Sequence, residues 1–263
     1  MPDDLARARR WSQRTDPRSA VRTAVVWDAL DPLLDRQART LGRPLVVVDV
    51  GGGTGGFAVP LAELGHQVTV VDPSPDALAA LARRASEADV VARIRPLQGD
   101  AGSLVPLVGA GSADLVLCHG ALEYVDQPEA AVQDAVEVLA PGGLLSLLVT
   151  QRLGAVLARA LSGRFADAQR LLDDPFGRAG DRDPVPHRFD RSGLLAMLAS
   201  EPLQVRAVHG VRLFSDLLPG SLVDGDPEAA AALLDLERAA SDHAAHPELI
   251  AIAAQLHLVA QRH

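Results

Sequence analysis

Five glycines follow a run of β-branched residues in the stretch VVVDVGGGTGGF, which covers residues 46–57. Gly51, Gly53 and Gly56 have the spacing G-x-G-x-x-G, and an acid, Asp72, follows about twenty residues later. Glycines let a backbone approach a ligand closely, and a carboxylate at the end of the next strand can bind both hydroxyls of a ribose. The pattern predicts a nucleoside-containing cofactor and leaves NAD and S-adenosylmethionine as alternatives.

Two further acids favour S-adenosylmethionine. Asp49 lies two residues before the first glycine, at the end of an otherwise apolar strand, where a dehydrogenase normally has an apolar residue. A buried carboxylate there needs a partner, and the cationic amino group of a methionine moiety can provide one. Asp100, in LQGDAGSL, follows the third predicted strand, where the exocyclic amine of adenine would lie. Asp72 suits either cofactor.

The fourth predicted strand ends in LVLCHG and places His119 at the mouth of the crevice where open α/β sheets bind ligands. Both a ligand-binding and a purely structural role remain open for this histidine. Cys118 is the single cysteine, so it forms no internal disulfide, and its apolar surroundings predict a buried, inert thiol. We assign no catalytic residue and no metal site.

Short apolar runs alternate with helical segments between residues 45 and 150, which predicts βα units around a parallel sheet. We predict strands at 45–50, 67–72, 92–97, 113–118 and 142–149. Helices are expected before Gly65, after Ser74, and from Gln127 to the Pro141-Gly142 stop.

The flanking segments predict four regions along the chain. Residues 1–44 form an N-terminal helical cover, with Pro32 expected to break it into two short helices, and residues 45–150 form the cofactor-binding core. Residues 151–202 form a lid: a helix over 151–175, a loop over 176–191 and a helix over 192–200. Residues 203–263 complete the sheet, with a strand over 203–214, a helix over 227–244 and a final strand QLHLVAQR.

The composition excludes some classes of function. All 25 basic residues are arginine, so lysine chemistry is excluded, and the net charge of −9 argues against indiscriminate binding of polyanions. The charge is nevertheless uneven, because residues 1–22 and 151–191 each contain more arginines than acids. There is no apolar run long enough to span a membrane and no apolar stretch typical of a signal peptide near the start, so we expect a cytoplasmic protein.

These motifs together resemble the class I S-adenosylmethionine-dependent methyltransferases over residues 45–150, where LAPGGLLSLLV adds a helix end, a turn and a strand. The resemblance implies an α/β Rossmann-like fold: a mostly parallel seven-stranded sheet with helices on both faces and an antiparallel last strand. A narrower resemblance covers nearly the whole chain. VRTAVVWDALD, LCHGALEYVDQP, LSGRFADAQ, GVRLFSDLL and LLDLE are similar, in this order, to segments of the bacterial tRNA 5-carboxymethoxyuridine methyltransferases.

That family esterifies the carboxylate of a modified wobble uridine, so the resemblance implies S-adenosylmethionine and tRNA as partners. The positions that match its cofactor-binding residues are Arg22, Gly51, Gly52, Asp72, Ala101, Gly102 and His119. With Asp49, Gly53 and Asp100 they complete the predicted site. Catalysis would need mainly the placement of a nucleophile near the methyl carbon, and a carboxylate nucleophile is already ionised at neutral pH.

Three alternatives remain. A small-molecule O- or N-methyltransferase would suit the acidic composition, because the lysines and many aromatics of the tRNA-modifying family are absent here. A regulator that binds S-adenosylmethionine without catalysis would bind the cofactor but methylate nothing. An NAD-dependent oxidoreductase is disfavoured by Asp49 and Asp100. Steep salt dependence of acceptor binding would separate tRNA from a small acid.

Arg22 provides a first test, because it lies outside the sheet core. We expect Arg22→Ala to weaken S-adenosylmethionine binding by about 1.5–3 kcal/mol, the size of one charge-assisted contact to the cofactor's carboxylate. Arg22→Lys should recover only part of the loss, since an ammonium keeps the charge but not the planar fork. Calorimetry measures both, and wild-type affinity of Arg22→Ala would remove Arg22 from the site.

Overall fold

The computed structural model describes the backbone of residues 17–223 and 225–263 and the side chains from residue 23 onward, residue 224 excepted. The chain divides into two compact units. The core unit comprises residues 36–149, 192–207 and 258–263. The flanking unit comprises the described residues up to Asp35 together with residues 150–191 and 208–257.

A seven-stranded sheet has the strand order β3-β2-β1-β4-β5-β7-β6. The strands are β1 (Val46–Val50), β2 (Gln67–Asp72), β3 (Ile94–Gln98), β4 (Ala113–His119), β5 (Leu139–Thr150), β6 (Leu203–Val211) and β7 (Gln255–Arg262). The first five pair in parallel. β7 runs antiparallel to β5, since Gln261 contacts Gly142 near one end of the pair and Gln151 contacts Ala254 near the other. The predicted fold class is confirmed.

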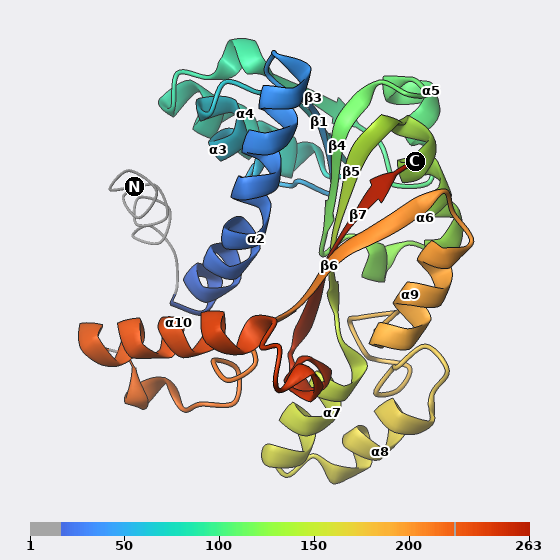
Figure 1. Cartoon of the computed structure of the whole chain (residues 1–263). Helices are drawn as coiled ribbons and strands as arrows, with labels where there is room; N and C mark the ends of the chain where they lie inside the picture. Colours follow the sequence, from blue (N-terminus) through green and yellow to red (C-terminus); the bar gives the residue numbers. More distant parts are fainter. Residues whose placement is uncertain (1–16, 224) are drawn as a thin grey trace. The chain divides into compact units, whose positions relative to one another are not determined.

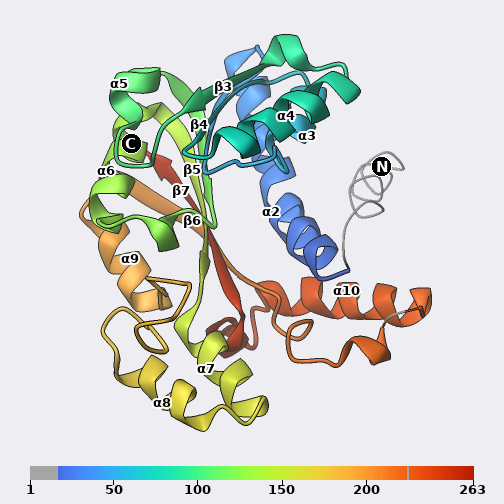
Figure 2. The same cartoon turned by 180° about the vertical axis from the view of Figure 1, so that it is seen from behind.

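Helices cover both faces of the sheet in the core unit, which explains why β1, β2 and β4 are nearly continuous runs of buried apolar residues. In Figures 1 and 2, α3 and α4 lie on one face and α5 and α6 on the other. In the described part of the chain the helices are α2 (Pro17–Leu41), α3 (Ala58–Glu63), α4 (Pro75–Glu87), α5 (Leu104–Val108), α6 (Pro128–Val138), α7 (Arg152–Leu161), α8 (Phe165–Asp173), α9 (Arg191–Ala199) and α10 (Pro227–Ser241). Short 3₁₀ helices are η1 (Val91–Arg93), η2 (Leu122–Tyr124), η3 (Gly220–Leu222) and η4 (Pro247–Ile252).

The structure corrects several predicted elements. α2 continues through Pro32 as one helix instead of breaking there. The helix predicted over 151–175 is two helices, because Gly163 adopts a left-handed φ of 75° and ends α7. β5 begins at Leu139, and the Pro141-Gly142 turn forms an irregularity within its pairing with β4 rather than a boundary before it. α5 was not predicted.

β6 ends at Val211, three residues earlier than predicted, because a buried carboxylate takes the next amides. Glu237 of α10 accepts hydrogen bonds from the backbone N–H groups of Leu213, Phe214 and Ser215 at 2.8–3.0 Å. The flanking unit is also closely packed where Gln151 donates to two carbonyls near η4, at Ile250 and Ala253. Among the described residues, no helix has the length and apolar character needed to cross a membrane.

The entry into β1 is fixed by one buried carboxylate, Asp114 at the start of β4. Asp114 accepts two hydrogen bonds from the Arg43 guanidinium, at 2.7 and 3.0 Å, and a third from the backbone N–H of Val46 at 2.8 Å. The Asp114 side chain is 5% exposed, whereas that of Arg43 is 48% exposed. The carboxylate therefore aligns β1 with β4, and the arginine contributes from the solvent side.

This geometry predicts unequal effects of the two partners on stability. Asp114→Ala should lower the free energy of unfolding by about 2–3 kcal/mol, because it leaves the Val46 amide and Arg43 without their acceptor. Arg43→Ala should cost about 1 kcal/mol or less, since its guanidinium is half exposed and the Val46 bond survives. Urea denaturation measures both values, and equal losses would contradict the assigned hierarchy.

Candidate functional site

Most of the predicted cofactor residues lie in the core unit at the carboxyl ends of neighbouring parallel strands. Asp49 is the penultimate residue of β1, Asp72 is the last residue of β2, and His119 is the last residue of β4. Asp100 follows β3 by two residues. Because carboxyl ends of parallel strands meet at one edge of a sheet, the structure brings these four side chains to the same edge.

The glycine loop after β1 passes so close to its neighbours that side chains do not fit. Gly51 has a φ of 67°, and a Cβ added there would lie 2.5 Å from the Cβ of Ala121. A Cβ at Gly52 would lie 2.5 Å from Oδ2 of Asp49. Gly53 has a φ of 53°, which also favours glycine. The loop therefore exposes backbone rather than side chains at the edge of the sheet.

Asp49 is a buried acid with an unsatisfied oxygen. The residue is 2% exposed, and its Oδ2 atom has no hydrogen-bond partner among the described residues. Burial, and then the negative charge of Asp72, raises the pKa of Asp49 to about 7. A cationic group placed here would satisfy the oxygen and restore the ionised form.

Asp72 joins the glycine loop to β2. Its Oδ2 accepts a hydrogen bond from the backbone N–H of Gly53 at 2.8 Å, and its Oδ1 accepts one from that of Ser74 at 2.9 Å. Each carboxylate oxygen has a second lone pair. Asp72 is thus held in a fixed orientation and can still accept two hydroxyl groups of a ligand.

The loop after β3 is organised by its own aspartate. Oδ1 of Asp100 accepts a hydrogen bond from the backbone N–H of Gly102 at 2.9 Å, and Ala101 between them is buried. Asp100 itself is exposed. This local turn presents the aspartate and the two following residues together beside the end of β2, with which β3 pairs.

His119 is half-buried and held from two sides. Its Nε2 lies 2.8 Å from Oγ of Ser146 on β5, and its ring meets that of Phe57 edge-on with centroids 4.6 Å apart. Phe57 and Ser146 were not among the predicted site residues. Phe57 stands directly after the glycines and was detectable there, whereas Ser146 lies within an apolar strand and becomes visible only through the register of β4 and β5.

Arg22 and Cys118 are the two remaining residues with an expectation from the sequence. The backbone of Arg22 belongs to α2, but its side chain lies outside the described part of the chain. Cys118 is buried, and its pKa is raised to about 12, chiefly by burial and further by the charges of Glu123 and Asp49. The thiol is therefore buried, as predicted, and stays protonated.

Comparison with known proteins gives the same interpretation as this geometry. Residues 48–147 match a family model described as a methyltransferase domain. A tRNA 5-carboxymethoxyuridine methyltransferase of Escherichia coli K12 is 31% identical over 198 residues, which are 75% of this chain and 73% of that protein. The chain belongs to the class I S-adenosylmethionine-dependent methyltransferases. Its cofactor is S-adenosylmethionine.

Other methyltransferases are similar to this one. A ubiquinone biosynthesis O-methyltransferase of Xanthomonas campestris pv. campestris strain B100 is 33% identical over 210 residues, 78% of this chain and 80% of that protein. Among solved structures, the magnesium protoporphyrin IX methyltransferase of Synechocystis PCC 6803 with bound SAH has a TM-score of 0.57. It is 15% identical and aligns over 99% of this chain and 95% of its own, so it shows the fold alone.

The buried acid of this methyltransferase fits its cofactor. S-adenosylmethionine carries an amino group that is protonated up to about pH 8. The unsatisfied oxygen of Asp49 beside the bare backbone of Gly52 offers an anionic acceptor where no side chain competes.

This arrangement predicts a pH dependence of cofactor affinity. Because the pKa of Asp49 is about 7 in the free protein, the carboxylate is largely neutral below that pH and anionic above it. We expect S-adenosylmethionine binding to strengthen as pH rises through 7 and to level off before the ligand's own amine loses its proton near about pH 8. Calorimetry across this range measures it; Asp49→Asn should bind more weakly and flatten the profile, and an unchanged profile would exclude Asp49.

Proposed function

We propose that this methyltransferase esterifies the carboxylate of a modified wobble uridine in tRNA. The supporting observations are the resemblance of GVRLFSDLL and LLDLE, which lie outside the cofactor-binding core, to segments of that tRNA-modifying family, and the similarity to the tRNA 5-carboxymethoxyuridine methyltransferase of Escherichia coli K12. It spans 198 residues, whereas the methyltransferase domain match spans residues 48–147. The similarity therefore includes segments outside the cofactor-binding core, where class I methyltransferases differ in their acceptors.

The proposal assigns a role to each residue of the site. Asp49 pairs with the amino group of the methionine moiety, and the backbone of Gly51, Gly52 and Gly53 lies along that moiety and the ribose. Asp72 accepts both ribose hydroxyls. The turn of Asp100, Ala101 and Gly102 contacts the adenine, and Arg22 binds the cofactor's carboxylate.

His119 lies at the carboxyl end of β4, beside the other predicted residues, and Ser146 and Phe57 fix its ring. In the proposed site it forms the wall beside the sulfonium. When bound, S-adenosylmethionine supplies an electrophilic methyl group. The residues of the chain orient the carboxylate acceptor in line with that group and exclude water. No general base is needed, because the acceptor is already ionised.

One observation favours a small-molecule oxygen acceptor as a second candidate. Residues 151–191 contain eight arginines, but Arg164, Arg170, Arg178 and Arg188 each pair with an aspartate of the same segment. These pairs reduce the charge available to phosphates. The similar ubiquinone biosynthesis O-methyltransferase acts on such an acceptor class by its name.

The chemistry of the product distinguishes the two candidates. The purified enzyme is incubated with methyl-labelled S-adenosylmethionine and either tRNA or fractionated small metabolites. Prior mild alkaline treatment of the tRNA removes existing esters and regenerates free carboxylates. We expect label in the tRNA fraction that a second alkaline treatment releases as volatile methanol, because an ester is saponified and an ether or N-methyl group is not.

Salt provides the matched control. Affinity for tRNA should fall steeply between about 50 and 200 mM salt, since several phosphate contacts are lost together. Affinity for a small acid should hardly change over the same range. Label that resists alkali, or that appears only in the metabolite fraction, would refute esterification of tRNA and favour the second candidate.

A further inference from the structure

The loop after α8 presents an ordered aromatic side chain to solvent. The Phe176 ring meets that of His187 edge-on, with centroids 5.4 Å apart and an interplanar angle of 86°. The Arg178 guanidinium lies over the Phe176 ring, 5.1 Å from its centroid. Phe176 nevertheless remains 48% exposed. We call these three residues the Phe176 platform.

Asp174 at the end of α8 holds the platform in place. Its Oδ1 accepts hydrogen bonds from the backbone N–H groups of Phe176 at 2.8 Å and Arg178 at 3.2 Å. Both of its oxygens also accept from the Arg178 guanidinium, the shortest bond being 2.9 Å. The backbone N–H of Arg188 donates to the carbonyl of Phe176 at 2.8 Å. The ring is therefore oriented before any ligand binds, which reduces the entropy lost on binding.

A buried ion pair fixes the same loop from within. Arg188 and Asp183 lie 2.6 Å apart with side chains 4% and 1% exposed, and Arg188 also donates to the carbonyl of Gly177 at 2.8 Å. Burial alone would raise the pKa of Asp183. Hydrogen bonds from Arg188 and from the amides of Ala179 and Val185 outweigh this effect and lower the pKa to about 2. Because breaking a buried charge pair would leave an uncompensated buried charge, the pair holds the two side chains together. These contacts hold the loop that carries Phe176 in one conformation.

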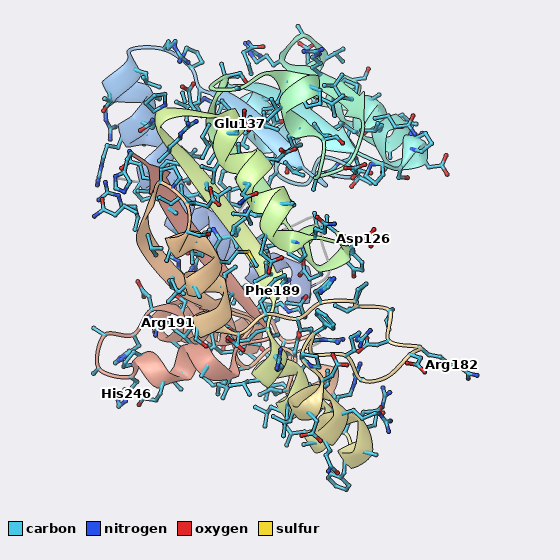
Figure 3. The ribbon with its side chains drawn as sticks, turned by 90° about the vertical axis from the view of Figure 1, so that its right-hand side faces the viewer. Asp126, Glu137, Arg182, Phe189, Arg191 and His246 are labelled. Atoms are coloured by element: carbon cyan, nitrogen blue, oxygen red, sulfur yellow. The ribbon has the colours of Figure 1, made fainter. Side chains whose placement is uncertain are left out.

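The surrounding surface combines exposed rings with arginines. Among the described residues, Tyr124, Phe165 and Phe176 are the exposed large aromatics; Phe165 begins α8 and Phe176 follows it in the loop. The side chains of Arg164 and Arg170 are each more than half exposed. Figure 3 shows Arg182 extending outward from the tip of the loop. Residues 151–191 hold eight arginines against six aspartates in a chain whose net charge is −9.

We propose that the Phe176 platform, together with Phe165, is the surface on which unpaired bases of the tRNA acceptor stack. Every base has a π-face that stacks on aromatic rings and on guanidinium planes. Although Arg164 and Arg170 each pair with Asp167, their side chains are more than half exposed and can contact phosphates. A pre-oriented, arginine-backed ring in a locally basic segment matches that chemistry. This inference rests on the proposed function and adds to it the part of the chain that recognises RNA.

The experiment measures binding and methylation of the alkali-treated tRNA by wild type, Phe176→Ala, Phe176→Trp and Leu172→Ala. We expect Phe176→Ala to bind the tRNA about 5- to 100-fold more weakly, with a raised KM and little change in kcat, since one stacked base is lost. Phe176→Trp keeps a π-face and should bind like wild type. Leu172 is 52% exposed on α8, the helix that precedes the loop of Phe176, so Leu172→Ala is the matched apolar control and should have no effect.

Two independent readouts separate the possible failures. All variants should bind S-adenosylmethionine like wild type and give the same circular dichroism spectrum, and a fully paired RNA duplex should show no difference between wild type and Phe176→Ala. If wild type binds and esterifies tRNA while Phe176→Ala does the same with equal KM, the platform is refuted and the proposed function stands.

Three other outcomes would refute base stacking on the Phe176 platform. If wild type neither binds nor methylates tRNA, the proposed function and this inference fail together. Equal losses in Phe176→Ala and Leu172→Ala would refute stacking and indicate apolar docking. If Phe176→Ala loses binding to vesicles of anionic phospholipid that wild type binds, while its tRNA binding stays intact, base stacking on the Phe176 platform is refuted in favour of a membrane surface.

Discussion

At the end of β1 the backbone passes between Ala121 and Asp49 through a space that admits no side chain, and the organisation of the site depends on this close approach. A Cβ at Gly51 would lie 2.5 Å from the Cβ of Ala121, and a Cβ at Gly52 would lie 2.5 Å from Oδ2 of Asp49. The same loop is bound to β2, because Gly51 donates to the carbonyl of Val71 and Gly53 donates to Asp72. Displacing the loop would break both connections. It would also uncover the carboxylate of Asp49, so the positions of the glycine loop, Asp49 and Asp72 depend on one another.

The sequence was most informative where one physical requirement acts alone. The final strand, QLHLVAQR, was predicted with the bounds that the structure has. The acids near the ends of β1 and β2 and just after β3 were found because polar residues stand out at the ends of apolar runs. Pro32 was misread, since the penalty of a proline inside a helix is a local rule that the packing around α2 overrides. Ser146 was missed for the opposite reason: its contact with His119 is set by sheet register, which a single sequence does not specify.

Charge counts along the sequence were the least reliable guide to function. Residues 151–191 contain more arginines than acids, yet half of these arginines pair with aspartates three to five residues away and hold local structure. Arg188 is the extreme case, since it is buried and holds the loop that carries Phe176. What distinguishes the segment is thus its shape and its exposed rings more than its net charge. Paired and available arginines can be told apart only from side-chain contacts, because pairing depends on which residues face each other across the turns.

Cys118 gives the molecule a built-in reporter of its own opening. It is the single cysteine of the chain, and it lies in the middle of the sheet, in register with Val50 of β1 and with Leu147 of β5. Burial keeps its thiol protonated, so an alkylating reagent has neither access nor a thiolate to attack in the native state. Modification must wait for separation of β4 from its neighbours. The rate of labelling at this one atom therefore follows the population of sheet-opened molecules, without an engineered probe and without a competing thiol.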